Sequence, residues 1–118
     1  MMDAKRVLIV DDDKSIQRFF TLILQRKGYS TDTAETGKEA LEKISRQSYD
    51  VALIDVILPD MNGLDLLKSF PPNTKKIIIT GTASEETHKR AQTEGADAYL
   101  LKPIKPEKLL QTIANKLT

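Results

Sequence analysis

Short, unbroken apolar runs alternate along this chain with longer segments of mixed polarity. The runs span residues 7–10, 51–54, 77–79 and 99–101. A strand that is covered on both faces has a continuous apolar sequence, whereas a strand with one face in water alternates apolar and polar residues. The four runs therefore predict covered strands of a parallel sheet.

The segments between the runs carry apolar residues at helical spacing. These residues form four groups: Ile16, Phe19, Phe20 and Ile23; Ala40, Leu41 and Ile44; Leu64, Leu67 and Phe70; and Leu109, Leu110, Ile113 and Leu117. Each group lies on one face of a helix, and that face can cover the sheet. Residues 84–94 contain no large aliphatic residue, so the helix predicted there should be weakly anchored and easy to shift.

A fifth strand is predicted at residues 30–34, where the sequence is more polar and suits the edge of the sheet. The pattern is then (βα)5, and we predict a doubly wound α/β domain. Its five-stranded parallel sheet is expected in the flavodoxin-like order 2-1-3-4-5. Because 118 residues are the length of one domain, residues 1–118 are expected to form a single unit.

Polar residues follow the predicted strands where each strand ends. They are Asp11, Asp12 and Asp13 after the first strand, Asp55 after the third, Thr80 after the fourth and Lys102 after the fifth. In the predicted order the first and third strands are neighbours, so Asp11, Asp12 and Asp55 should share one pocket. Repulsion among three carboxylates requires either a protonated carboxyl group or a bound cation.

The residue types at this predicted pocket point to phosphoryl chemistry. Oxygen ligands without His or Cys favour a hard cation, and a small site suits Mg²⁺ with several waters better than Ca²⁺. Asp55 can act as a nucleophile and form an acyl phosphate. Lys102 is long enough to reach the pocket from two strands away, and Thr80 can donate a hydrogen bond to a phosphoryl oxygen. Asp13 precedes the first helical segment, so we expect it to be an N-cap and not a metal ligand.

Four motifs, in this order, resemble those of the receiver domains of two-component response regulators, over essentially the whole chain. LIVDDD resembles the acid-pair motif, LIDVILPDMNG the phosphoacceptor segment, IIITG the switch-threonine segment and AYLLKP the segment of the switch aromatic and Lys-Pro. The resemblance implies that Asp55 receives a phosphoryl group from a phosphohistidine of a sensor histidine kinase or phosphotransfer protein. It also implies that Asp12 binds Mg²⁺ directly, that Asp11 acts largely through water, that Ile57 contributes its backbone carbonyl, and that the Lys102-Pro103 peptide is cis.

The resemblance further implies a switch with slow Mg²⁺-dependent autodephosphorylation, and not a turnover enzyme. Thr80 would move toward the phosphoryl group and Tyr99 would rotate into the vacated space. The face formed by the helix at residues 84–94, the strand at 99–101 and the last helix would then change its preference for an output domain or protein. The protein is expected to be a monomer or a phosphorylation-dependent dimer.

Three positions depart from the common family pattern. Gly81 stands where Ala is more frequent, Ile57 places an apolar side chain near the phosphoacceptor, and Ile104 replaces a common Phe. Leu22 lies off the apolar face of the first helix, which leaves two readings open: an isolated surface leucine, or a contact for the kinase.

Other functions fit the sequence less well. A haloacid-dehalogenase-like phosphatase would use Asp11 as its nucleophile, with DDDKS as its loop, but it needs a further acidic pair after its lysine. A flavin mononucleotide binder needs phosphate-cradling Ser, Thr and Gly loops, where this chain has acids. An EF-hand needs Gly and Glu where Ile16 and Leu22 stand.

Composition gives the expected surroundings of the protein. A formal charge of +1 offers no bulk attraction to nucleic acid or to an anionic membrane, and no direct nucleic-acid binding by this chain is expected. No Cys is present, and we see neither a signal peptide nor an apolar run long enough to cross a bilayer. We therefore expect a cytoplasmic protein, either a stand-alone receiver or part of a longer regulator.

Overall fold

Five strands alternate with helices along the part of the chain that the structure, a computed structural model, describes, residues 4–82 and 84–118. In chain order the elements are β1 (Arg6–Val10), α1 (Lys14–Arg26), β2 (Ser30–Ala34), α2 (Gly37–Arg46), β3 (Val51–Ile54), the 3₁₀ helix η1 (Gly63–Ser69), β4 (Lys75–Thr80), α3 (Glu85–Thr93), β5 (Ala98–Leu101) and α4 (Pro106–Leu117). The strands form one parallel sheet in the order β2-β1-β3-β4-β5. The predicted doubly wound fold is therefore confirmed.

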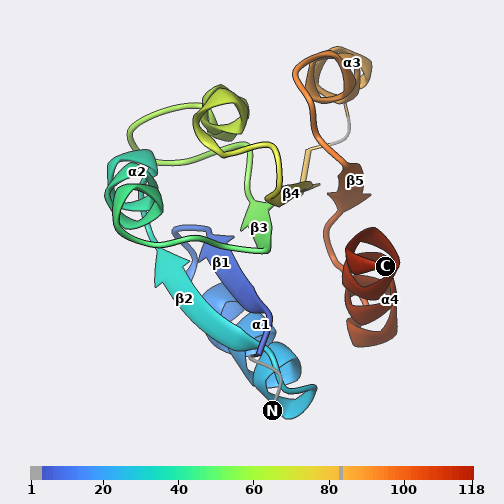
Figure 1. The fold of residues 1–118 in the computed structure, drawn as a ribbon. Helices are drawn as coiled ribbons and strands as arrows, with labels where there is room; N and C mark the ends of the chain where they lie inside the picture. Colours follow the sequence, from blue (N-terminus) through green and yellow to red (C-terminus); the bar gives the residue numbers. More distant parts are fainter. Residues whose placement is uncertain (1–3, 83) are drawn as a thin grey trace.

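The helices lie in two layers, one on each face of the sheet. In Figure 1, α2, η1 and α3 lie along one side of the strands and α1 and α4 along the other. Alternate residues of one strand point to opposite faces, and β1 shows the result: Leu8 packs in the core under α2 and η1, and Ile9 in the core under α1 and α4. The central strands need apolar residues at every position because both faces are covered.

The helix faces are narrower than the apolar spacing predicts. Phe20 and Leu24, one helical turn apart, are buried on α1, although Leu24 lies outside the predicted set. Phe19 and Leu41 were expected on covered faces, but 43% and 37% of their surface is exposed. A helix that touches a sheet along one stripe covers its central line of side chains and leaves the flanking positions in solvent. None of the helices in residues 4–82 and 84–118 is long and apolar enough to cross a membrane.

The strand β5 is an edge strand, and the expectation that both of its faces are covered is wrong. Its residues are half-buried or exposed, and Leu101 is 47% exposed. The neighbouring helix α3 offers mainly small and polar side chains, so little apolar surface is available to cover β5. The polar strand β2 occupies the other edge, as predicted.

The segment after β3 forms a 3₁₀ helix instead of an α-helix. A 3₁₀ helix has three residues per turn, so residues three apart lie above one another. Leu64 and Leu67 of η1 are buried in this way, as is Phe70 directly after it, in agreement with the predicted face. Leu66, outside that face, is buried as well.

A partly buried hydrogen-bond network ties β2 to the segment before β3. Tyr49 is 4% exposed, and its hydroxyl donates to the Asp32 carboxylate at 2.7 Å. The Gln47 side-chain amide also donates to Asp32. Burial and the hydrogen bond to Asp32 raise the pKa of Tyr49 to about 12.

This network predicts a loss of stability in alkaline solution. The folded-state pKa of Tyr49 lies above the ordinary value of 10.0, so its contribution is complete below pH 10 and is lost as the pH rises toward about 12. We expect the loss to be about 2–3 kcal/mol. Denaturant unfolding of wild type and Tyr49→Phe across this range checks it, with Tyr29→Phe as control. A parallel decline in all three proteins would contradict the assignment.

Candidate phosphoacceptor site

The sheet brings the acidic residues together at its carboxyl edge. Val10 of β1 lies beside Ile54 of β3, so Asp11 and Asp55, the next residues along the two strands, leave neighbouring strands at the same level. Carboxylate oxygens of Asp11, Asp12 and Asp55 lie within 4.8 Å of one another. The predicted clustering of these three side chains is therefore present in the structure.

The three carboxylates differ in their surroundings. Asp11 is buried, Asp55 is half-buried and Asp12 is exposed. Burial raises the pKa of Asp11, although hydrogen bonds from Lys102 and from the backbone N–H of Asp13 act in the opposite direction. Burial thus makes the ionised form of Asp11 less favourable, and additional positive charge nearby would stabilise that form.

Asp13 belongs to the helix and not to the acidic cluster. Its side chain accepts hydrogen bonds from the backbone N–H groups of Ser15 and Ile16 and caps α1, as predicted. These bonds satisfy two amides of the first turn of α1 that have no partner within the helix.

Lys102 provides a positive charge between two of the carboxylates. Its Nζ atom lies 2.8 Å from Asp11 Oδ2 and 3.0 Å from Asp55 Oδ2. Burial lowers the pKa of Lys102, but the hydrogen bonds to Asp11 and Asp55 outweigh it and raise the pKa above its ordinary value. The peptide bond between Lys102 and Pro103 is cis. One ammonium group faces three carboxylates, so the site keeps an excess of negative charge.

The loop after Asp55 is closed by two backbone hydrogen bonds that flank Ile57. Ile57 and Asn62 lie opposite each other, and the flanking bonds run from Leu58 N to Met61 O and from Gly63 N to Val56 O. This is the arrangement in which the facing pair exchanges no hydrogen bonds. Among the described residues no backbone N–H donates to the Ile57 carbonyl.

This set of donors fits a hard divalent cation. The ligand atoms at the cluster are carboxylate oxygens, and the described part of the chain offers no His or Cys there. Oxygen ligands of this kind suit Mg²⁺ or Ca²⁺. The acidic triad is therefore a candidate metal site.

Thr80 of β4 and Tyr99 of the neighbouring strand β5 both make hydrogen bonds to Thr82, in the loop after β4. Thr80 is fully buried at the end of β4, and its hydroxyl accepts a hydrogen bond from Thr82 N at 3.3 Å. The Tyr99 hydroxyl donates to the Thr82 carbonyl at 3.4 Å. The Tyr99 ring stacks on His88 of α3, with ring centroids 4.5 Å apart.

Some residues that shape the site carry only a weak signal in the sequence. Gln17 is buried, and its side-chain amide donates to the Asp11 carbonyl. Its distance of three residues from Phe20 places it on the covered face of α1, which could have identified it. The stacking of His88 on Tyr99 joins two elements and has no signal in local spacing.

Known proteins are similar to this chain in sequence and in fold. The chain matches the family described as "Response regulator receiver domain" over residues 7–114. Response regulator ArlR of Staphylococcus saprophyticus is 36% identical over 110 residues, which are 92% of this chain and 50% of that protein. The chain thus spans about half the length of the curated relatives it matches.

Solved structures that are similar to this chain are response regulators as well. A response regulator receiver domain protein (CheY-like) from Methanospirillum hungatei JF-1 is 44% identical, with a TM-score of 0.94, and the match covers 97% of this chain and 94% of that one. A response regulator from Burkholderia pseudomallei, crystallised with a phosphorylated aspartic acid, a calcium ion and citrate, is 29% identical with a TM-score of 0.86. That match covers 92% of this chain and 66% of the other.

Proposed function

Because this chain belongs to the response regulator receiver domain family, we propose that Asp55 is the residue on which it accepts a phosphoryl group. A receiver domain is a phosphoacceptor switch and not a classic enzyme. The observation that carries the assignment is the placement of the Lys102 ammonium between Asp11 and Asp55 at the edge of the sheet. Asp55 follows β3, next to β1, so its carboxylate lies beside the other acids.

In the proposed reaction an oxygen of Asp55 attacks the phosphorus of a phosphohistidine on a partner. The new O–P bond forms as the N–P bond breaks, and the histidine nitrogen keeps the electron pair of that bond. Lys102 neutralises charge on the transferred oxygens, and Thr80 donates its hydroxyl hydrogen to one of them. The product is an acyl phosphate, which water slowly hydrolyses back to Asp55.

We assign Asp11, Asp12, Asp55 and the Ile57 carbonyl as the residues that hold Mg²⁺, with Asp12 as a direct ligand and Asp11 acting largely through water. Exposure of Asp12 suits an ion that keeps several waters, as Mg²⁺ does. The chemistry that bound Mg²⁺ supplies is neutralisation of charge on the phosphoryl oxygens and the carboxylates. The similar Burkholderia pseudomallei response regulator was crystallised with a phosphorylated aspartic acid and a calcium ion, which supports a divalent cation as a ligand of this family.

Uptake of phosphate from acetyl phosphate tests this function. We expect the intact mass to rise by one phosphoryl group in Mg²⁺ and to stay unchanged when EDTA replaces it. Asp12→Asn removes a charged ligand and should raise the Mg²⁺ concentration for half-maximal uptake, by about 10-fold if one ligand contributes about 1.4 kcal/mol. Uptake of equal rate in EDTA would contradict a metal-dependent site.

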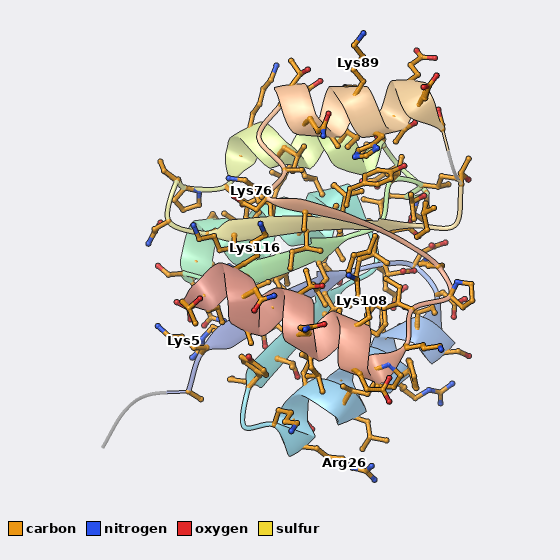
Figure 2. The ribbon with its side chains drawn as sticks, turned by 90° about the vertical axis from the view of Figure 1, so that its right-hand side faces the viewer. Lys5, Arg26, Lys76, Lys89, Lys108 and Lys116 are labelled. Carbon is orange, nitrogen blue, oxygen red and sulfur yellow. The ribbon has the colours of Figure 1, made fainter. Side chains whose placement is uncertain are left out.

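We propose that phosphorylation is transmitted through Thr80 and Tyr99 to the face formed by α3, β5 and α4, which is turned to the viewer in Figure 2. The Thr80 hydroxyl would exchange its bond with Thr82 for one with the phosphoryl group, and Tyr99 would rotate into the space that Thr80 leaves. Tyr99 would then leave the His88 ring. Among the described residues of α3 only Ala91 is buried, so this helix has little core packing that resists a shift.

Hydrogen exchange in α3 should report this switch. Aromatic pairs contribute about 0.5–1.5 kcal/mol, so loss of the stack should speed exchange of the α3 amides by about 2–10-fold on addition of beryllofluoride and Mg²⁺. His88→Ala lacks the stack and should show a smaller change, and the amides of α1 serve as the internal control. Identical α3 exchange with and without beryllofluoride in the wild type would contradict the proposal.

The family implies a histidine kinase as partner. We propose that the direct donor is a sensor histidine kinase or phosphotransfer protein and that an output domain or protein reads the α3, β5 and α4 face. In Figure 2 the labelled lysines of that face are spread, with Lys89 on α3 and Lys108 and Lys116 along α4. We also propose that this chain does not bind nucleic acid directly, since its formal charge is only +1.

We further propose that residues 1–118 act as one receiver domain in the cytoplasm, either alone or within a longer regulator. A monomer or a phosphorylation-dependent dimer fits the fold. The NtrC4 receiver domain, whose beryllofluoride-activated form was solved as a dimer in solution, is 38% identical in sequence to this chain with a TM-score of 0.89. This similarity supports the phosphorylation-dependent dimer.

A further inference from the structure

The loop between β3 and η1 is closed at its base like a small hairpin. Gly63 N donates to the Val56 carbonyl at 2.6 Å, and Leu58 N donates to the Met61 carbonyl at 3.3 Å. Val56 and Leu58 point into the core, whereas the Ile57 side chain is 64% exposed. We call residues 56–58, which carry the Ile57 carbonyl, the arm of the loop, and residues 59–60 its tip. The two hydrogen bonds fix the arm but not the tip.

The tip of the loop is bound to a different part of the fold through Asp60. Asp60 Oδ1 accepts a hydrogen bond from Gly37 N at 2.9 Å, and Oδ2 accepts one from Lys38 N at 3.0 Å. Both donors are in the first turn of α2, where backbone N–H groups have no partner within the helix and carry positive partial charge. These two hydrogen bonds lower the pKa of Asp60, which therefore stays ionised near neutral pH.

Met61 adds a packing contact at the same helix end. A Cβ atom built on Gly37 would lie 2.2 Å from Met61 Sδ, so the methionine side chain occupies the space that a larger residue at this position would need. Gly37 is buried and Met61 is half-buried against the core. The loop tip therefore sits on the amino end of α2 through both a charged cap and a close contact.

We propose that Asp60 is a positioning residue for the phosphoacceptor site, an inference that rests on the proposed function. By fixing the loop tip on α2, Asp60 holds the arm between Asp55 and the tip in one orientation. The Ile57 carbonyl and the Asp55 carboxylate then stay available to the same divalent cation. The Ile57 N–H, whose nitrogen lies 3.3 Å from Asp55 Oδ1, links this arm to the phosphoacceptor side chain.

If Asp60 only capped α2, its loss would affect stability but not metal binding. Another cap of the same helix end, Thr36, allows the two roles to be compared. Thr36 is the helix's own N-cap, and its hydroxyl accepts a hydrogen bond from Glu39 N. Thr36→Ala therefore removes a cap from the same helix end without touching the loop. Loss of either cap should lower the melting temperature, but only loss of Asp60 should affect metal binding.

Mg²⁺ affinity of the unphosphorylated protein, measured by calorimetry well below the melting temperatures, separates the two roles. We expect Asp60→Ala to weaken binding by about 10-fold or more, as loss of residues that orient metal ligands does, and Thr36→Ala to bind as wild type. Asp60→Asn also lacks the charge but keeps an acceptor oxygen, so it should bind more tightly than Asp60→Ala. Amide exchange of residues 56–63 without metal should be faster than in wild type in both Asp60 variants and unchanged in Thr36→Ala.

Wild-type affinity in Asp60→Ala, or equal weakening in Thr36→Ala, would overturn the inference. If Asp60→Ala does not fold, Asp60→Asn decides instead: wild-type affinity together with unchanged loop exchange would overturn it. A wild-type protein that binds no Mg²⁺ would contradict the proposed function as well. Wild-type protein that binds Mg²⁺ but takes up no phosphate would contradict the proposed function. The Mg²⁺ affinities of the variants would still test whether Asp60 positions the metal ligands.

Discussion

Replacement of Lys102 with alanine is expected to slow phosphate uptake by about 10²–10³-fold. The ammonium group bonds to Asp11 and Asp55 and places a positive charge 3.0 Å from an oxygen of the proposed nucleophile. Removal of one such group that stabilises developing charge commonly has an effect of this size. The change also leaves a buried Asp11 and a half-buried Asp55 without their shared partner, so the variant should be less stable in EDTA.

Lys105→Ala is the matched control for this variant. Lys105 lies three residues further along the same connection, is exposed, and makes no side-chain cap bond to α4. Rates of uptake from acetyl phosphate, taken by intact mass at saturating Mg²⁺, should be unchanged in the control. Circular dichroism at the assay temperature shows whether Lys102→Ala remains folded. A folded Lys102→Ala with the wild-type rate would remove the lysine from the proposed mechanism.

Replacement of Gly63 with alanine should have the largest effect on stability. Gly63 is buried, and a Cβ atom there would lie 1.9 Å from the Asp55 carbonyl oxygen and 2.9 Å from its carbonyl carbon. These atoms belong to the backbone and cannot move aside as a flexible side chain can. We expect a loss of about 3 kcal/mol or more in the free energy of unfolding, with slower phosphate uptake because Asp55 itself must shift.

Gly81→Ala provides the comparison, since a Cβ atom at Gly81 would have no neighbour within 4 Å. Denaturant unfolding should give a change of no more than about 0.5 kcal/mol for this variant, as for most surface substitutions. If both alanine variants are equally stable, the close approach of Gly63 to Asp55 is not present in solution.

The strands and the site were predictable because both follow from simple rules of a parallel sheet. A strand covered on both faces needs apolar residues throughout, which marks β1, β3 and β4 in the sequence. The carboxyl ends of parallel neighbours meet at one edge, so the strand order alone brings Asp11 and Asp55 together. The length of a lysine side chain explains how Lys102 joins them from β5.

Features that depend on the width and pitch of helices were not predictable. Spacing identifies the face of α1 that packs on the sheet but not how far the cover extends, which is why Phe19 is exposed and Leu24 is buried. In the short η1 segment, three and 3.6 residues per turn give nearly the same apolar pattern. Sequence spacing therefore could not distinguish a 3₁₀ helix from an α-helix there.

Contacts between distant segments away from the strand ends were not predictable. Asp60 caps a helix that begins 23 residues earlier, and nothing in its local sequence specifies that partner. Arg90 of α3 forms ion pairs with Glu94 on its own helix and with Asp65 of η1. The spacing of four residues suggests the first pair, but the second requires the three-dimensional arrangement.

Peptide mapping after phosphate uptake identifies the residue that carries the phosphoryl group. The protein is incubated with acetyl phosphate and Mg²⁺, the acyl phosphate is reduced with borohydride, and the modified residue is located by mass spectrometry. We expect modification at Asp55 alone and none in Asp55→Asn. Modification at Asp11 or Asp12 in the wild type, or uptake by Asp55→Asn at the wild-type rate, would contradict it.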